Sequence, residues 1–217
     1  MSRAGAHRGI PFVVTAPSGT GKTTVCRAVL ERDPGIRFSV SHTTRRPREG
    51  EREGLDYHFV SVEEFERLIA EGGFLEHAEY GGNHYGTSRW ALEEPLEAGY
   101  DLFLEIEVQG ARQVRERRSD ARFIFLLPPS MEVAAERLSR RGTDSPETIE
   151  RRLTVAREEV MAADFFDYAV VNDQFEETVA SVIEIVDSER RGSDSAVRER
   201  YGCSDRLKCW LRGDDSR

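Results

Sequence analysis

Four short apolar runs recur along the chain, and each has the pattern of a strand that is covered on both faces. They are IPFVVTA (residues 10–16), YDLFLEIE (100–107), ARFIFLLP (121–128) and YAVVN (168–172). Nearly continuous runs of β-branched, aromatic and leucine side chains are typical of buried parallel strands. The pattern therefore predicts a parallel sheet at the centre of the fold.

Helical periodicity fills the segments between and after these runs. Ser130 is a candidate N-cap, and Pro146 stands at the first position of another helix, where its missing N–H is tolerated. Strands that alternate with amphipathic helices predict a three-layer α/β fold, in which the parallel sheet lies between two layers of helices. The expected helices span residues 22–33, 109–118, 130–141, 146–162 and 175–190.

Residues 36–98 have a different pattern, in which apolar and polar residues alternate as they do in half-exposed strands. Ser61-Val-Glu-Glu64 within it matches a capping box that opens a helix. This segment predicts a small mixed β/α insertion. Residues 191–217 are polar, and we expect an appendage there that forms a short helix or no regular structure.

Composition narrows the class of protein. The 217 residues fit one domain with a small insertion, and the net charge of −9 disfavours non-specific binding to nucleic acid or membrane surfaces. The three cysteines are too few for a disulfide scaffold, so we expect free thiols. The first residues lack the apolar core of a signal peptide, and no run approaches the ~20 residues of a membrane span. We expect a soluble cytoplasmic protein.

The first strand is followed by PSGTGKTT, which has the arrangement of a phosphate-binding loop that opens a helix. The glycines permit close backbone approach, so that successive N–H groups and the helix N-terminus face a polyphosphate. Lys22, one of only two lysines among 31 basic residues, would bridge the β- and γ-phosphates, and the Thr23 hydroxyl would ligate Mg²⁺. The expected loop residues are Ala16, Pro17, Ser18, Gly19, Thr20, Gly21, Lys22, Thr23 and Thr24.

The loop motif is imperfect and does not name an acceptor. Ala16 stands where the strict pattern has glycine. ATPases, GTPases, small-molecule kinases and sulfotransferases all use such a loop, and a glycine-rich turn without a ligand is the alternative.

Candidate acceptor residues lie in the insertion. Arg45 and Arg48 flank a stiff proline in SHTTRRPREG and suit bidentate capture of a phosphate, to which Tyr57 and Tyr85 would add hydroxyl donors. Glu76 lies on an apolar strand, where its carboxylate would accept from the adjacent N1–H and N2–H of guanine. Taken singly, a solvated basic turn, two packed tyrosines and an exposed strand glutamate explain these residues as well.

Taken in order, these segments resemble guanylate kinase. The resemblance runs from APSGTGKTT through SVSHTTRRPREGE, DYHFV, FLEHAEYGGNHYGTS and RLSRRGTDSPETIERRL to DYAVVND, over about residues 10–190. It implies transfer of a phosphoryl group from ATP to GMP with Mg²⁺. It also implies a core of about residues 10–38, 99–135 and 160–190, a GMP-binding region of 39–98 and a lid of 136–159.

The resemblance assigns roles to individual residues of this chain. The guanine base would contact Ser41, Glu76 and Thr87, and Asn172 would lie near adenine. Arg45, Arg48, Tyr57 and Tyr85 would hold the GMP phosphate, as the residues themselves suggest. Lys22 and three lid arginines, Arg137, Arg141 and Arg152, would act on the transferring phosphoryl group.

One segment departs from the family pattern. The family has Asp-x-Asp before Gln-Gly, whereas this chain has Glu105-Ile106-Glu107. The resemblance places the first acid near Mg²⁺ and the second near guanine. Glutamate keeps the charge and adds one methylene, so both roles are expected with altered geometry.

Two alternatives remain at this point. A related P-loop kinase acting on ribose 1,5-bisphosphate would lack the guanine-binding residues. A non-catalytic guanylate-kinase-like module would have a degraded phosphate loop, and loss of ATP binding in Lys22→Ala distinguishes an intact loop. We expect ATP and GMP as partners, no nucleic acid or membrane, and a monomer or homo-oligomer.

Overall fold

The computed structural model describes residues 8–140 and 145–213. It divides into two compact units, each built from two stretches of chain. The described residues of the first unit are 8–13 and 35–121, and those of the second are 14–34, 122–140 and 145–213. Strand β1 (Pro11–Thr15) contributes its first residues to the first unit and Val14–Thr15 to the second. The three-part division into core, insertion and lid stays a prediction.

The first unit contains one part of the parallel sheet. Strand β2 (Ile36–Phe38) pairs in parallel with β7 (Asp101–Glu105), and β7 lies next to β1. Phe12, Leu102 and Phe103 have no exposed surface. Strands were therefore predicted correctly in the first two apolar runs, because side chains of this kind are stable only when both faces of the sheet are covered.

A second sheet in the first unit has the strand order β4-β3-β6-β5. It contains β3 (His42–Thr43), β4 (His58–Phe59), β5 (Phe74–Tyr80) and β6 (Asn83–Ser88). β5 and β6 form an antiparallel hairpin whose turn residues, Gly81 and Gly82, both have positive φ. The register of this hairpin places Glu76 opposite Thr87.

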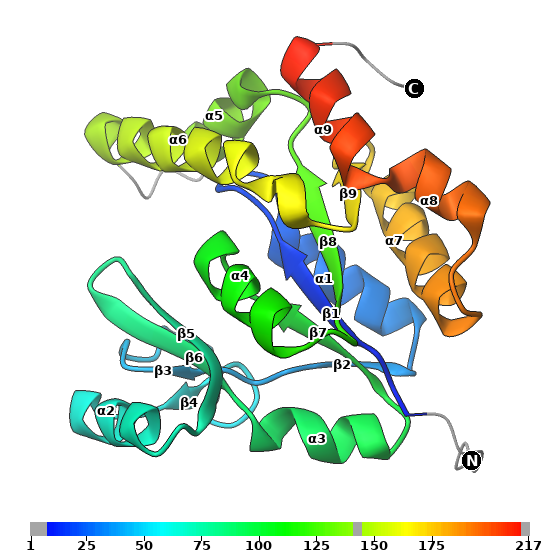
Figure 1. Ribbon diagram of the computed structural model, residues 1–217. Coiled ribbons are helices and arrows are strands. Elements are labelled where there is room, and N and C mark those ends of the chain that lie inside the picture. Colours follow the sequence, from blue (N-terminus) through cyan, green and yellow to red (C-terminus); the bar gives the residue numbers. More distant parts are fainter. Residues whose placement is uncertain (1–7, 141–144, 214–217) are drawn as a thin grey trace. The chain divides into compact units, whose positions relative to one another are not determined.

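Three helices complete the first unit. Helix α2 (Val62–Ala70) begins as predicted, with the Ser61 hydroxyl accepting a hydrogen bond from the Glu64 N–H at 3.1 Å. Helix α3 (Trp90–Glu97), which contains Pro95, was not predicted. Helix α4 (Val108–Arg117) packs against β5, as Figure 1 shows.

The second unit contains the other part of the parallel sheet. Strand β8 (Arg122–Leu127) lies between β1 and β9 (Tyr168–Val171) and pairs in parallel with β9. Helices α1 and α7 lie side by side in this unit (Figure 1). The α/β fold with a parallel sheet is thereby confirmed. Its helical elements are α1 (Lys22–Arg32), α5 (Met131–Arg140), α6 (Pro146–Met161), η1 (Ala163–Phe165) and α7 (Phe175–Arg190).

The C-terminal segment is folded into the second unit. It forms α8 (Ser195–Tyr201) and α9 (Cys203–Arg212), which contact β9. Tyr201 and Leu207 are buried, and the Trp210 indole N–H donates to the Pro128 carbonyl at 2.7 Å. The described part of residues 191–217 is thus helical, because its few apolar side chains meet a surface that accepts them.

Two further expectations concern the cysteines and membrane-spanning helices. Cys26, Cys203 and Cys209 are free thiols, and burial raises the pKa of Cys203 to about 12. Within residues 8–140 and 145–213, no helix has both the length and the apolar character needed to cross a membrane.

Candidate active site

The phosphate loop, residues 16–21, connects β1 to α1 in the second unit. Gly19 and Gly21 have φ of +86° and +95°, in the left-handed region that favours glycine. A side chain at Gly19 is excluded as well, since its Cβ would lie 2.7 Å from the Ala134 carbonyl oxygen. Gly21 is the N-cap, so the helix begins at Lys22 and its first N–H groups border the loop.

Two side chains from other elements hold the loop at Thr20. The Asn172 side-chain amide, which follows β9, donates to the Thr20 carbonyl at 2.6 Å. The Arg137 guanidinium on α5 donates to the same carbonyl at 3.2 Å and to the Asn172 backbone carbonyl at 3.1 Å. These bonds fix the peptide that precedes Gly21, and therefore the direction in which the loop N–H groups point.

Two of the three predicted lid arginines, Arg137 and Arg152, lie in the described part of the chain. Arg137 lies on α5 and contacts the loop backbone, and Arg152 on α6 donates to the Ser18 hydroxyl at 3.3 Å. Arg141 lies outside the described residues. The structure thus brings two predicted arginines to the phosphate loop. Their action on a transferring phosphoryl group, and that of Asn172 near adenine, stay predictions.

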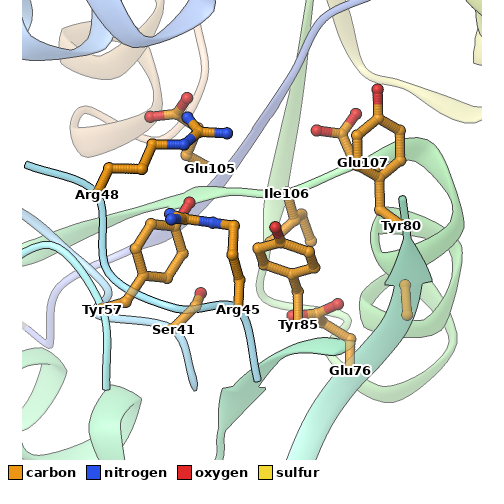
Figure 2. A pocket seen from close by; sticks show the side chains of 11 residues that line it. Ser41, Arg45, Arg48, Tyr57, Glu76, Tyr80, Tyr85, Glu105, Ile106 and Glu107 are labelled. Carbon is orange, nitrogen blue, oxygen red and sulfur yellow. The ribbon is translucent and has the colours of Figure 1, made fainter. Parts of the chain in front are cut away.

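A separate cavity, the acceptor pocket, lies within the first unit (Figure 2). In the view of Figure 2, Arg45, Arg48 and Tyr57 lie toward one side, while Tyr80 and Glu107 lie toward the other. Eight predicted site residues therefore meet in one cavity, although they come from separate segments of the sequence. The pocket is lined by Ser41, Arg45, Arg48, Tyr57, Glu76, Ala78, Tyr80, Tyr85, Glu105, Ile106 and Glu107.

The cationic part of the pocket is organised by an acid that the sequence reasoning did not single out. The Glu51 carboxylate accepts two bonds from the Arg45 guanidinium, at 2.8 and 3.0 Å, and one from the Arg48 backbone N–H at 2.7 Å. The Arg45 bonds lower the pKa of Glu51, and the same pair raises the pKa of Arg45. Glu51 thus ties the side chain of Arg45 to the backbone at Arg48 and holds residues 45–51 in one shape.

Aromatic rings border the same part of the pocket. The Arg45 guanidinium lies 5.4 Å from the centre of the Tyr57 ring, and the rings of Tyr57 and Tyr85 meet edge to face at 6.0 Å. Two guanidinium groups with neighbouring phenol hydroxyls form a donor set suited to a phosphate monoester.

Glu76 is a buried carboxylate in the wall of the pocket. Only 3% of its surface is exposed, and its Oε1 accepts from the Thr87 hydroxyl at 2.6 Å and the Thr87 backbone N–H at 2.8 Å. Burial raises the pKa of Glu76, the Thr87 bonds and Arg117 oppose the rise, and Glu107 adds to it. A carboxylate held this way has a strong demand for further donors, which a ligand with adjacent N–H groups would meet.

Thr87 and Ser41 have different positions relative to the pocket. Ser41 lines it, whereas Thr87 is fully buried behind Glu76. Their hydroxyl oxygens are 3.3 Å apart, so the three side chains form one chain of polar contacts. The geometry makes Thr87 a support for Glu76, and its direct contact with a base stays a prediction.

The acids that depart from the family pattern lie at the end of β7. Glu105 is the last residue of the strand, and Glu107 is the N-cap of α4. Both line the acceptor pocket. Carboxylates at the C-terminal end of a parallel strand occupy the edge where α/β proteins commonly bind ligands.

The residues proposed for a metal supply the right chemistry for Mg²⁺. Thr23 offers a hydroxyl oxygen on the first turn of α1, and Glu105 offers a carboxylate. Mg²⁺ prefers oxygen ligands and keeps several waters, with one or two protein oxygens and substrate phosphates completing its shell. The described residues contain no group of three or more His, Cys, Asp or Glu that could hold a metal.

A histidine beside the pocket makes the stability of the protein depend on pH. His42 is buried, and the centre of its ring lies 4.8 Å from that of His58. Burial is the larger cause, and the charge of His58 the smaller, that lowers the pKa of His42 below the ordinary 6.5. Glu53 and Glu64 act in the opposite direction. At this site the unfolded chain then binds more protons near pH 6, so we expect His42 to lower the free energy of unfolding as the pH is lowered from 7 to 5, whereas Glu76, whose pKa burial raises, acts in the opposite direction.

The measurement is urea unfolding of the wild-type protein and of His42→Phe across this pH range. A single group changes stability by at most about 1.4 kcal/mol per pH unit. The variant should show a shallower slope than the wild type, with a remainder from His77, whose pKa burial also lowers. Identical slopes would mean that His42 takes up no additional proton on unfolding.

Three residues that contact the pocket residues or the strand that carries them were not predicted from the sequence. Glu51 acts through Arg45, and Gln113 on α4 holds β5 by donating to the His77 carbonyl at 2.7 Å. Gly110 lies against Glu76. None of these carries a recognisable role alone; the acid pattern in REGE and the Gln-Gly pair after the strand were the available signals.

Comparisons with known proteins agree with this geometry. Residues 8–189 match the sequence model of guanylate kinase. A guanylate kinase of Thiobacillus denitrificans is 51% identical over 185 residues, covering 85% of this chain and 88% of that protein. A guanylate kinase of Vibrio parahaemolyticus is 46% identical over 202 residues, covering 92% and 98%. The crystal structure of guanylate kinase from Anaplasma phagocytophilum has a TM-score of 0.70 and 38% identity, covering 84% and 87%. The chain belongs to the guanylate kinase family.

Proposed function

We propose that this protein transfers the γ-phosphoryl group of ATP to GMP, giving ADP and GDP. The observation that carries the proposal is the position of Glu76, whose buried carboxylate shares one pocket with Arg45 and Arg48. Guanine has two adjacent N–H donors for a carboxylate, whereas adenine offers no such edge. A site that joins a carboxylate acceptor to a phosphate-binding arginine pair suits GMP.

In the proposed complex, the acceptor pocket binds GMP through both ends of the nucleotide. Glu76 accepts from guanine N1–H and N2–H, with Ser41 and Glu107 beside the base. Arg45, Arg48, Tyr57 and Tyr85 hold the phosphate, and Glu51 keeps Arg45 oriented. Because the phosphate is already anionic near neutral pH, the reaction needs no strong general base.

The proposed donor site is the phosphate loop with Lys22. The loop N–H groups and the α1 N-terminus bind the ATP phosphates, and Lys22 neutralises charge on the β- and γ-phosphates. Asn172 and Arg137 support the loop through the Thr20 carbonyl. Arg137, Arg141 and Arg152 are proposed to stabilise charge on the transferring group, which is the main contribution a protein makes to phosphoryl transfer.

A kinase of this family needs a divalent metal ion. We propose Mg²⁺, held by Thr23 and Glu105 together with the ATP phosphates. The ion supplies neutralisation of phosphate charge when it is bound. The extra methylene of Glu105 relative to aspartate alters the reach of this carboxylate but keeps its charge.

The setting of the reaction is also part of the proposal. The net charge of −9 and the three free thiols support a cytoplasmic protein whose partners are ATP and GMP, without nucleic acid. The protein is a monomer or a homo-oligomer.

The proposal is tested by measuring ADP formation from ATP and Mg²⁺ with GMP, AMP, CMP, UMP or ribose 1,5-bisphosphate as acceptor. Selective turnover with GMP is the expected result. Turnover with ribose 1,5-bisphosphate instead, or none with any acceptor in a folded protein, would contradict the proposal.

A further inference from the structure

A helical glycine faces the carboxylate proposed to bind guanine. Gly110 is the third residue of α4, and its φ is not positive. Its backbone would therefore accept any L-residue. Glycine is less favourable than alanine inside a helix, so the local structure favours a side chain here.

The space beside Gly110 is occupied by Glu76. A Cβ at position 110 would lie 2.3 Å from Glu76 Oε2 and 3.1 Å from Glu76 Cδ, with Ile106 Cδ1 at an ordinary 3.5 Å. The two clashing atoms belong to one carboxyl group and neither belongs to the backbone. A methyl group at this position would therefore displace the carboxylate and leave the main chain where it is.

The carboxylate is held on its other side by Thr87. Oε1 accepts from the Thr87 hydroxyl at 2.6 Å and from its N–H at 2.8 Å, and the β5–β6 register fixes Thr87 opposite Glu76. Glu76 Oε2 faces Gly110. The carboxylate thus lies between two donors and a bare backbone, and a displacement from either side changes where both oxygens point.

We propose that Gly110 is a specificity-determining residue, which leaves the space that the Glu76 carboxylate needs in order to accept both N–H donors of guanine. This inference rests on the proposed function, in which Glu76 binds the base. Gly110 contacts no substrate and acts by positioning Glu76.

The test compares Gly110→Ala with the wild type, using GMP and IMP as acceptors. IMP keeps N1–H and lacks the 2-amino group, so the ratio of kcat/KM for GMP to that for IMP reports the paired hydrogen bonds. In the variant we expect this ratio to fall by about tenfold or more, and KM for GMP to rise by a similar factor. KM for ATP should be unchanged, and the variant should remain folded.

Gln109→Ala is the matched control, because Gln109 is the preceding helical residue and is exposed. It should leave the GMP-to-IMP ratio at the wild-type value. In a Glu76→Ala background, Gly110→Ala should have no further effect on the ratio, since the group through which it acts is gone.

Each other outcome overturns the inference. If Gly110→Ala lowers activity toward GMP and IMP equally, or still changes the ratio without Glu76, it does not act through that carboxylate. If the variant fails to fold, the methyl group meets the core and not a movable side chain. If instead Glu76→Ala alone leaves the wild-type ratio unchanged, the proposed role of Glu76 fails before Gly110 is in question.

Discussion

Replacing Lys22 by alanine is expected to lower kcat for ADP formation with GMP by about 10²–10³-fold, the usual effect of removing one preorganised charge-stabilising group. Lys22 is the first residue of α1 and directly follows Gly21, the last residue of the phosphate loop. The phosphates of two anionic substrates repel each other, and the ammonium group offsets that repulsion at the group being transferred. ATP binding with Mg²⁺ should weaken as well.

The chain offers a matched control, because Lys208 is its only other lysine. Lys208 lies on α9, is largely exposed and has an ion pair with Asp205 at 3.6 Å. Lys208→Ala should leave kcat within about twofold of the wild type, since exposed ion pairs contribute little. If Lys22→Ala retained wild-type turnover in a folded protein, the phosphate loop would not be the donor site.

Replacing Glu76 by glutamine is expected to remove the preference for guanine while making the unliganded protein more stable at pH 7. A hydrogen bond to a charged group contributes about 1.5–3 kcal/mol, so the loss of a paired acceptor should raise KM for GMP about 10- to 100-fold. The glutamine amide would also present donors to the N–H groups of guanine. Kinetics with GMP and IMP measure the change in preference.

The gain in stability follows from the pKa of Glu76. Burial raises this pKa above the ordinary 4.5, so the neutral carboxyl stabilises the fold at low pH and that contribution is lost as the pH rises through the native pKa. Once ionised, Glu76 is a charge that the folded protein has desolvated. Glutamine removes the charge and keeps an oxygen that accepts the two Thr87 bonds.

Thermal unfolding from pH 4 to 8 tests this expectation. The midpoint of the wild type relative to that of Glu76→Gln should fall as the pH rises. Glu79→Gln is the control, because Glu79 lies on the same strand and is exposed. A variant that was less stable than the wild type at pH 7 would show that the Glu76 carboxylate stabilises the unliganded protein, which would contradict the expected cost of burying it.

The two expected results would set function against stability at this position. A buried carboxylate with unfilled acceptor capacity destabilises the free protein and gives the ligand a strong partner. The same opposition holds at Gly110, where a better helix former would displace the functional group.

Local features of the sequence determined most of the secondary structure. Strands β1, β7, β8 and β9 match the four apolar runs within one or two residues, because such runs are stable only inside a covered sheet. The helix over Phe175–Arg190 has the expected bounds. Ser61 and Ser145 accept the capping bonds that open α2 and α6, since capping depends on residues three apart.

Helix α3 was missed for a local reason. Pro95 lies inside it, and proline in a helix interior argues against the helix. Leu92 and Leu96 are both fully buried, so tertiary packing outweighs the proline. The polar C-terminal segment also lacks a strong local signal, because its helices are stabilised by contacts such as that of Trp210 with Pro128.

The sequence by itself determined the α/β class, the phosphate loop and the identity of most pocket residues, since these depend on periodicity and on short motifs. Tertiary structure alone decided how the residues act together. It placed Glu51 on Arg45, Thr87 behind Glu76, Asn172 on the Thr20 carbonyl and Gly110 against the Glu76 carboxylate. These contacts join separate elements, and only strand register and packing bring such positions together.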